Sequence, residues 1–95
     1  MKTKVLNFVS KIPKGRVTSY KILAEKTSSN PRAVAKILAS NQKQIQIPCH
    51  RVVNSSGEVG GYNLGKDLKV KLLTSEGVNI RNNKIVDSFF QFDNI

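Results

Sequence analysis

The sequence has few of the residues that build disulfides, metal sites or membrane spans. Its 95 residues include one cysteine, Cys49, one histidine, His50, and no tryptophan. A single cysteine excludes an intramolecular disulfide, and one cysteine with one histidine is too few for a structural zinc site, so we expect neither metal nor cofactor. No stretch approaches the roughly 18 uncharged apolar residues that a membrane span needs, and the N-terminal segment lacks the apolar centre of a signal peptide. We therefore expect a cytoplasmic protein that does not contact a membrane.

Acidic residues are also scarce, six against 16 lysines and arginines, which gives a net charge of +10. Residues 1–51 hold eleven of the bases and a single acid, Glu25, whereas residues 52–95 hold five of each sign. All the excess positive charge thus belongs to the first half, which predicts a polyanionic partner on one part of the fold. Lysines kept only for solubility are the alternative reading of the charge.

Prolines and glycines are few, three and six, and they separate segments with helical periodicity. Apolar residues recurring near every 3.6 positions predict helices over residues 2–12, 20–26, 31–40 and 66–75. Ser19 and Asn30 precede the second and third helices as N-caps, and Pro31 takes the first position of the third helix. Gly77 suits the left-handed position after the fourth helix. The second and third helices, joined by a tight turn, form a helix-turn-helix pattern.

The length allows one domain over residues 1–95, with a tail at 81–95. Val52-Val53, the turn at residues 54–57 and Gly60-Gly61 read as a β-hairpin wing. We predict a mainly α, winged helix-turn-helix-like domain whose tail packs its phenylalanines onto the core.

The adjacent Cys49 and His50 are the candidates for chemistry. A lone cysteine is more often a small buried apolar residue, but an imidazole nearby lowers the cost of forming the reactive thiolate. Neighbours on an extended segment point to opposite sides, so His50 would act on Cys49 through a water molecule. The second imidazole nitrogen needs an acceptor, and Glu76, at the end of an apolar helix, is the best placed of the six acids. The residues alone indicate a candidate Cys-His-Glu nucleophile and no more.

Four separated segments carry a resemblance to a known family. The segment 47–52, IPCHRV, resembles the active-site signature of the methylated-DNA–protein-cysteine methyltransferases, also called 6-O-alkylguanine-DNA alkyltransferases. The similarity extends to IPKGRVTSY at 12–20, NPRAV at 30–34 and LLTSEGV at 72–78. It implies DNA repair by a single transfer of an alkyl group, from the exocyclic oxygen of a flipped-out guanine to Cys49.

The resemblance also implies roles for individual residues. His50 would take the thiol proton through a water, and Glu76 would orient His50. Asn41 would brace the site. Tyr20 would push the target phosphate and protonate the leaving guanine. Arg32 would fill the gap left by the base in double-stranded DNA bound through its minor groove. The other residues expected at the DNA are Ala33, Ala35, Lys36 and Arg51, and those expected in the base pocket are Val52, Tyr62 and Asn63.

Two other functions stay open. An alkyltransferase-like protein binds the lesion without accepting the alkyl group, although such proteins usually lack the cysteine. A plain helix-turn-helix module would use Cys49 only for packing. We expect a monomer, and Asn63-Leu64 leaves the preference between methyl and bulkier groups undecided.

Overall fold

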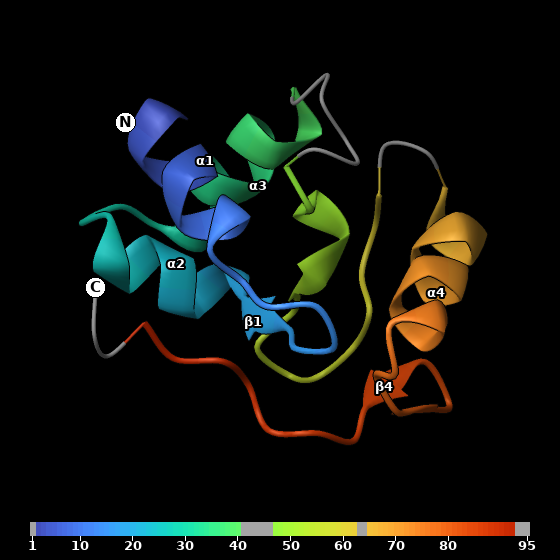
Figure 1. Cartoon of the computed structure of the whole chain (residues 1–95). Helices are drawn as coiled ribbons and strands as arrows, with labels where there is room; N and C mark the ends of the chain where they lie inside the picture. The colour runs from blue at the N-terminus through green and yellow to red at the C-terminus, as the bar shows by residue number, and fades with distance from the viewer. Residues whose placement is uncertain (1, 41–46, 63–64, 93–95) are drawn as a thin grey trace.

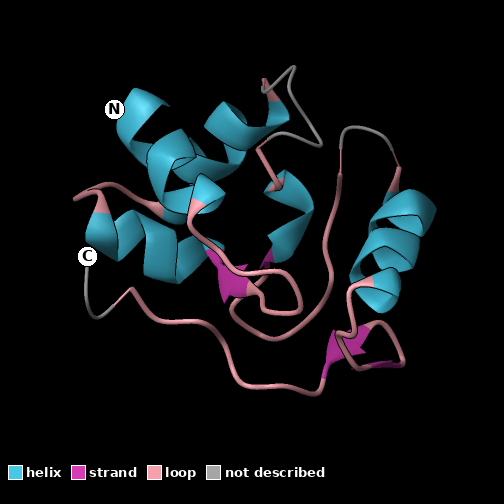
Figure 2. Ribbon diagram, viewed as in Figure 1, coloured by secondary structure: helices cyan, strands magenta, loops and turns pink. Residues whose placement is uncertain are grey.

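A computed structural model describes residues 2–40, 47–62 and 65–92 of the chain. Helices supply most of the regular structure in these residues (Figures 1 and 2). The α-helices run over α1 (Lys2–Ser10), α2 (Tyr20–Lys26), α3 (Pro31–Ala39) and α4 (Lys66–Ser75). The mainly helical class is as predicted, and α2 and α4 have the predicted bounds.

The beginnings of α2 and α3 follow from their capping residues. The Ser19 hydroxyl accepts a hydrogen bond from the Ile22 amide at 3.0 Å, and Asn30 Oδ1 accepts one from the Ala33 amide at 2.9 Å. Each bond satisfies an amide that the helix itself leaves without a partner. Both predicted caps are confirmed, and they fix where the two helices of the helix-turn-helix pattern begin.

Helices α1, α2 and α3 enclose the main hydrophobic core. Its fully buried aliphatic side chains include Val5 and Val9 from α1, Leu23 from α2 and Val34 from α3. Cys49 also belongs to this cluster. Because the core reaches the cysteine, packing of the three helices sets the position of the candidate nucleophile.

The short strands pair differently from the predicted wing. β1 (Thr18–Ser19) pairs in parallel with β2 (Val52–Val53), with Thr18 opposite Val52. The predicted turn is present, since the Gly57 amide bonds the Asn54 carbonyl at 2.9 Å, but β2 does not pair with residues 60–61 as a hairpin. Both valines are fully buried, which suits a strand covered on its two faces, as parallel pairing provides. The antiparallel hairpin is instead formed by β3 (Ile80–Arg81) and β4 (Lys84–Ile85).

The C-terminal segment lies along β1, as the red part of the ribbon shows (Figure 1). The Phe90 amide donates to the Val17 carbonyl at 2.6 Å, and Thr18 Oγ1 donates to the Phe90 carbonyl at 3.0 Å. Phe92 is fully buried and packs edge-to-face on Phe8, with ring centroids 5.2 Å apart. The predicted packing of the tail is confirmed, and it supports the strand that leads into α2.

Candidate active site

Cys49 opens a single 3-10 turn, η1 (Cys49–Arg51), that leads directly into β2. The Arg51 amide closes the turn on the Pro48 carbonyl at 3.0 Å. Cys49 is 5% exposed and His50 is 3% exposed. The expectation of an extended segment was wrong, because β pairing begins only at Val52, after the turn has redirected the chain.

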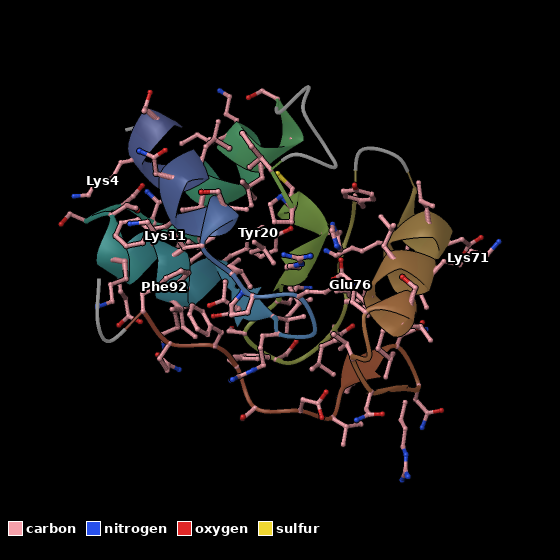
Figure 3. All side chains as sticks on the ribbon, in the orientation of Figure 1. Lys4, Lys11, Tyr20, Lys71, Glu76 and Phe92 are labelled. Carbon is pink, nitrogen blue, oxygen red and sulfur yellow. The ribbon has the colours of Figure 1, made fainter. Side chains whose placement is uncertain are left out.

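His50 and Glu76 meet between η1 and the end of α4, where Figure 3 shows Glu76. His50 Nε2 lies 3.0 Å from Glu76 Oε2. An ionised carboxylate only accepts hydrogen bonds, so His50 Nε2 carries the proton of this contact and a neutral ring has its lone pair on Nδ1. Nδ1 is buried and has no hydrogen-bond partner among the residues that the structure describes. The ring is thus held with its proton-accepting atom inside the protein.

Arg51 holds the same carboxylate from the other side. Its Nε donates to Glu76 Oε1 at 2.9 Å, its Nη2 donates to Oε2 at 2.7 Å, and its Nη1 donates to the Ile12 carbonyl at 2.8 Å. We expected Arg51 to bind DNA, whereas in the structure its planar guanidinium matches the half-buried carboxylate of Glu76. Arg51 is a support of the His50–Glu76 pair.

The environment shifts the pKa values of the two titrating partners. Burial lowers the pKa of His50, and this outweighs the hydrogen bond to Glu76 and its negative charge, which act in the opposite direction. Burial alone would raise the pKa of Glu76, but hydrogen bonds from Arg51 and His50 and their charges outweigh it and lower that pKa. At neutral pH the site therefore holds a neutral imidazole beside an ionised carboxylate.

Gly15 brings the loop before β1 against this site. Its φ is +88°, and a Cβ added there would lie 3.0 Å from the Glu76 carbonyl oxygen. Only glycine combines this left-handed backbone with so close an approach. The loop can therefore present the Ile12 carbonyl to Arg51 without displacing the end of α4.

Cys49 lies in the wall of a cavity of about 720 Å³. Its lining comes from α2, α3, η1 and the loop before α4, and includes Tyr20, Arg32, Ala35, Asn54, Ser55 and Tyr62. Burial and then the negative charge of a Cys49 thiolate raise the pKa of Tyr20 and of Tyr62, so both hydroxyls stay protonated at neutral pH. The cavity wall thus combines the cysteine with the side chains of two tyrosines (Figure 3 labels Tyr20).

Other predicted site residues lie elsewhere. Lys36 is exposed on α3 and Ala33 is half-buried, and neither lines the cavity. Val52, whose carbonyl was expected in the base pocket, is fully buried in the core and does not line the cavity either. Its carbonyl accepts a hydrogen bond from the Lys69 ammonium at 2.8 Å. Asn41 and Asn63 lie outside the described residues.

Sequence reasoning missed Lys69, which is fully buried beside this site. Its position four residues before the buried Leu73 and seven before Glu76 places it on the inward face of α4, and this spacing was the available signal.

Within residues 2–40, 47–62 and 65–92, no helix is long and apolar enough to cross a bilayer and no cluster of three metal-ligating side chains occurs.

Comparison with known proteins assigns the chain to a family. Residues 1–78 match the family described as "6-O-methylguanine DNA methyltransferase, DNA binding domain". A methylated-DNA–protein-cysteine methyltransferase of Sulfolobus acidocaldarius is 47% identical over 77 residues, covering 81% of this chain and 49% of the relative. One from Methanothermobacter thermautotrophicus is 43% identical, with 81% and 44% covered. The chain therefore spans about half the length of these curated relatives.

Solved structures agree with the sequence matches. The O6-methylguanine-DNA methyltransferase of Pyrococcus kodakaraensis superposes with a TM-score of 0.76 at 37% identity, covering 81% of this chain and 46% of that one. Mycobacterium tuberculosis OGT, solved in complex with DNA, gives a TM-score of 0.76 at 34% identity, with 79% and 48% covered. The match to the family covers 78 of the 95 residues, and the chain belongs to the 6-O-methylguanine DNA methyltransferase family through its DNA-binding domain.

Proposed function

We propose that this chain repairs double-stranded DNA by accepting a methyl group from the exocyclic oxygen of an alkylated guanine onto Cys49. One observation carries the proposal: Cys49 lies in a cavity wall immediately before a histidine that contacts the half-buried Glu76 carboxylate, and Arg51 binds the same carboxylate. This arrangement supplies a thiol, a neutral base and a fixed counter-charge, which nucleophilic transfer to sulfur requires. The relatives' names support the same substrate. Two structural neighbours were solved with DNA, one of them S. pombe Atl1 with damaged DNA containing O6-carboxymethylguanine, and this supports a DNA partner.

Proton transfer activates the nucleophile in this mechanism. The thiol proton passes through one water to His50 Nδ1, whose lone pair faces the interior. Glu76 accepts the hydrogen bond from Nε2 and stabilises the imidazolium that forms, while Arg51 keeps the carboxylate oriented. The lowered pKa of His50 leaves the ring unprotonated and able to accept at neutral pH.

The transfer step forms a carbon–sulfur bond as the carbon–oxygen bond breaks. The electron pair of the broken bond stays on the guanine, and the Tyr20 hydroxyl donates a proton to the guanine ring as it leaves. The carbon–sulfur bond of the thioether is stable to hydrolysis, so Cys49 does not return to a thiol and each molecule acts once. Asn41 braces the site in this proposal.

The guanine must leave the base stack to reach the sulfur, because an alkyl group inside a duplex is inaccessible. The cavity volume of about 720 Å³ is in the range typical of ligand pockets. Tyr62, whose buried hydroxyl has no partner among the described residues, and Asn63 belong to the base pocket. Arg32 at the start of α3 enters the vacated stack, and Ala33, Ala35 and Lys36 face the minor groove. The protein acts as a cytoplasmic monomer.

Mass spectrometry tests the proposal. Incubation with a duplex containing one 6-O-methylguanine should add the mass of one methylene to wild-type protein, at Cys49, while a matched undamaged duplex adds nothing. Cys49→Ser should bind both duplexes with wild-type affinity and gain no mass. Wild-type protein that binds the lesion without gaining mass would instead be a non-catalytic lesion-binding protein, and equal affinity for both duplexes would indicate a plain helix-turn-helix module.

A further inference from the structure

Lys69 on α4 is a fully buried lysine. Its Nζ donates to the Val52 carbonyl at 2.8 Å and to the Gly61 carbonyl at 3.0 Å. In the described part of the chain no carboxylate lies within 4.0 Å of it, since the ion pairs there are those of Glu76 with His50 and Arg51. A buried ammonium without a carboxylate partner is costly, and an apolar side chain would fill the same space at lower cost.

The charge of Lys69 is coupled to the nucleophile. Burial lowers the pKa of Lys69 to about 8, and the negative charge of a Cys49 thiolate acts in the opposite direction. The lysine is thus still protonated at neutral pH, with three donors, of which two are bound to carbonyl oxygens. The same attraction stabilises a thiolate at Cys49 when it forms.

The two carbonyls belong to different segments beside the site. Val52 follows the turn that carries Cys49, and Gly61 lines the cavity next to Tyr62. In Figure 1 the yellow segment that ends at residue 62 passes between η1 and α4. From α4, the Lys69 ammonium donates to the Gly61 carbonyl in this segment and to the Val52 carbonyl in β2. These two segments have no β-ladder between them in the described residues. Lys69 therefore helps to set the distance between them, together with the bond from the Asn54 amide to the Glu58 carbonyl at 3.0 Å.

We propose that Lys69 is a positioning residue for alkyl transfer, which holds the backbone beside Cys49 and the cavity loop before Tyr62 at a fixed spacing. This inference rests on the proposed function. Its consequence is that loss of Lys69 slows transfer from bound DNA while DNA affinity stays the same, because the residues proposed to contact DNA lie on α2 and α3.

The test compares Lys69→Met, Lys69→Gln and the control Lys71→Met under single-turnover conditions. Lys71 is exposed, points away from α4 (Figure 3), and its replacement removes the same charge. At saturating methylated DNA, Lys69→Met should transfer about tenfold more slowly than wild type, a loss of about 1.4 kcal/mol of transition-state stabilisation. Lys69→Gln, whose side-chain amide can still donate hydrogen bonds, should recover part of the transfer rate. Lys71→Met should transfer at the wild-type rate.

Three outcomes would overturn the assignment. They are a Lys69→Met rate equal to wild type, a loss confined to the Kd for DNA, and a Lys69→Gln rate as low as that of Lys69→Met. If Lys69→Met lacks a cooperative unfolding transition, the transfer rate and Kd of Lys69→Gln alone decide the test. If neither variant folds, Lys69 has a structural role instead. Wild-type protein that gains no methyl group refutes the proposed function and this inference together, whereas methyl gain with unaffected Lys69 variants refutes only this inference.

Discussion

Replacing Arg51 by methionine should destabilise the fold because it removes three charge-assisted hydrogen bonds at once. Two of them bind the Glu76 carboxylate at 2.9 and 2.7 Å, and the third binds the Ile12 carbonyl at 2.8 Å. Breaking a buried pair by removing one partner costs about 3–5 kcal/mol. The side chains of Arg51 and Glu76 are 15% and 11% exposed, so water can replace part of the loss. We expect a loss of about 2–3 kcal/mol at pH 7.

The pH dependence of this loss has a definite sign. The pKa of Glu76 is lowered from 4.5 in the folded protein, so its ion-pair contribution is fully present above pH 4.5 and disappears as the pH falls through the folded pKa. The difference in stability between wild type and Arg51→Met should therefore shrink below pH 4.5. His50, whose pKa is lowered from 6.5, adds a decline in wild-type stability as the pH falls below that value.

Urea denaturation at pH 7 and pH 4, followed by circular dichroism, measures both effects. Arg81→Met, at an exposed arginine of β3, is the matched control and should lie within about 0.5 kcal/mol of wild type. The double variant Arg51→Met/Glu76→Gln should lose less than the sum of the single losses, by about 1–3 kcal/mol. A pH 7 stability of Arg51→Met equal to wild type, or additive losses in the double variant, would refute the reasoning.

Two further predictions concern the tail and the DNA-binding face. Phe92→Ala should destabilise the fold by about 3–5 kcal/mol in the same urea assay, because Phe92 is fully buried against Phe8. The control Gln91→Ala, at an exposed position, should have little effect. Similar stabilities of the two variants would contradict the packing of the tail. Arg32→Ala should reduce the fluorescence increase of 2-aminopurine beside the lesion, which reports base flipping, more than it weakens binding to undamaged DNA. Lys26→Ala is the control. Equal losses of base flipping and of DNA binding in Arg32→Ala would argue against insertion of Arg32 into the base stack.

The local sequence determined the four helices and the bounds of α2 and α4, whereas α1 ends at Ser10, two residues before its predicted end. Ser19 and Asn30 cap α2 and α3 as predicted, and Gly77, with φ +94°, follows α4 as predicted, because caps and left-handed positions depend on a few adjacent residues. The adjacent Cys49 and His50 likewise indicated the candidate site, and the structure places Cys49 in the cavity wall and pairs His50 with Glu76. A candidate site formed by adjacent residues can be recognised in the sequence without knowledge of the fold.

The partners across the fold were decided by tertiary structure. Val52 and Val53 read as one strand of a hairpin, yet they pair in parallel with residues 18–19, because burial on both faces depends on which segments enclose them. Arg51 read as a DNA contact, but its guanidinium turns to Glu76, 25 positions away in the chain. The spacing along α4 could have shown that Lys69 faces inward, but its carbonyl partners could not be read from the sequence, because they come from two segments that only the folded chain brings together.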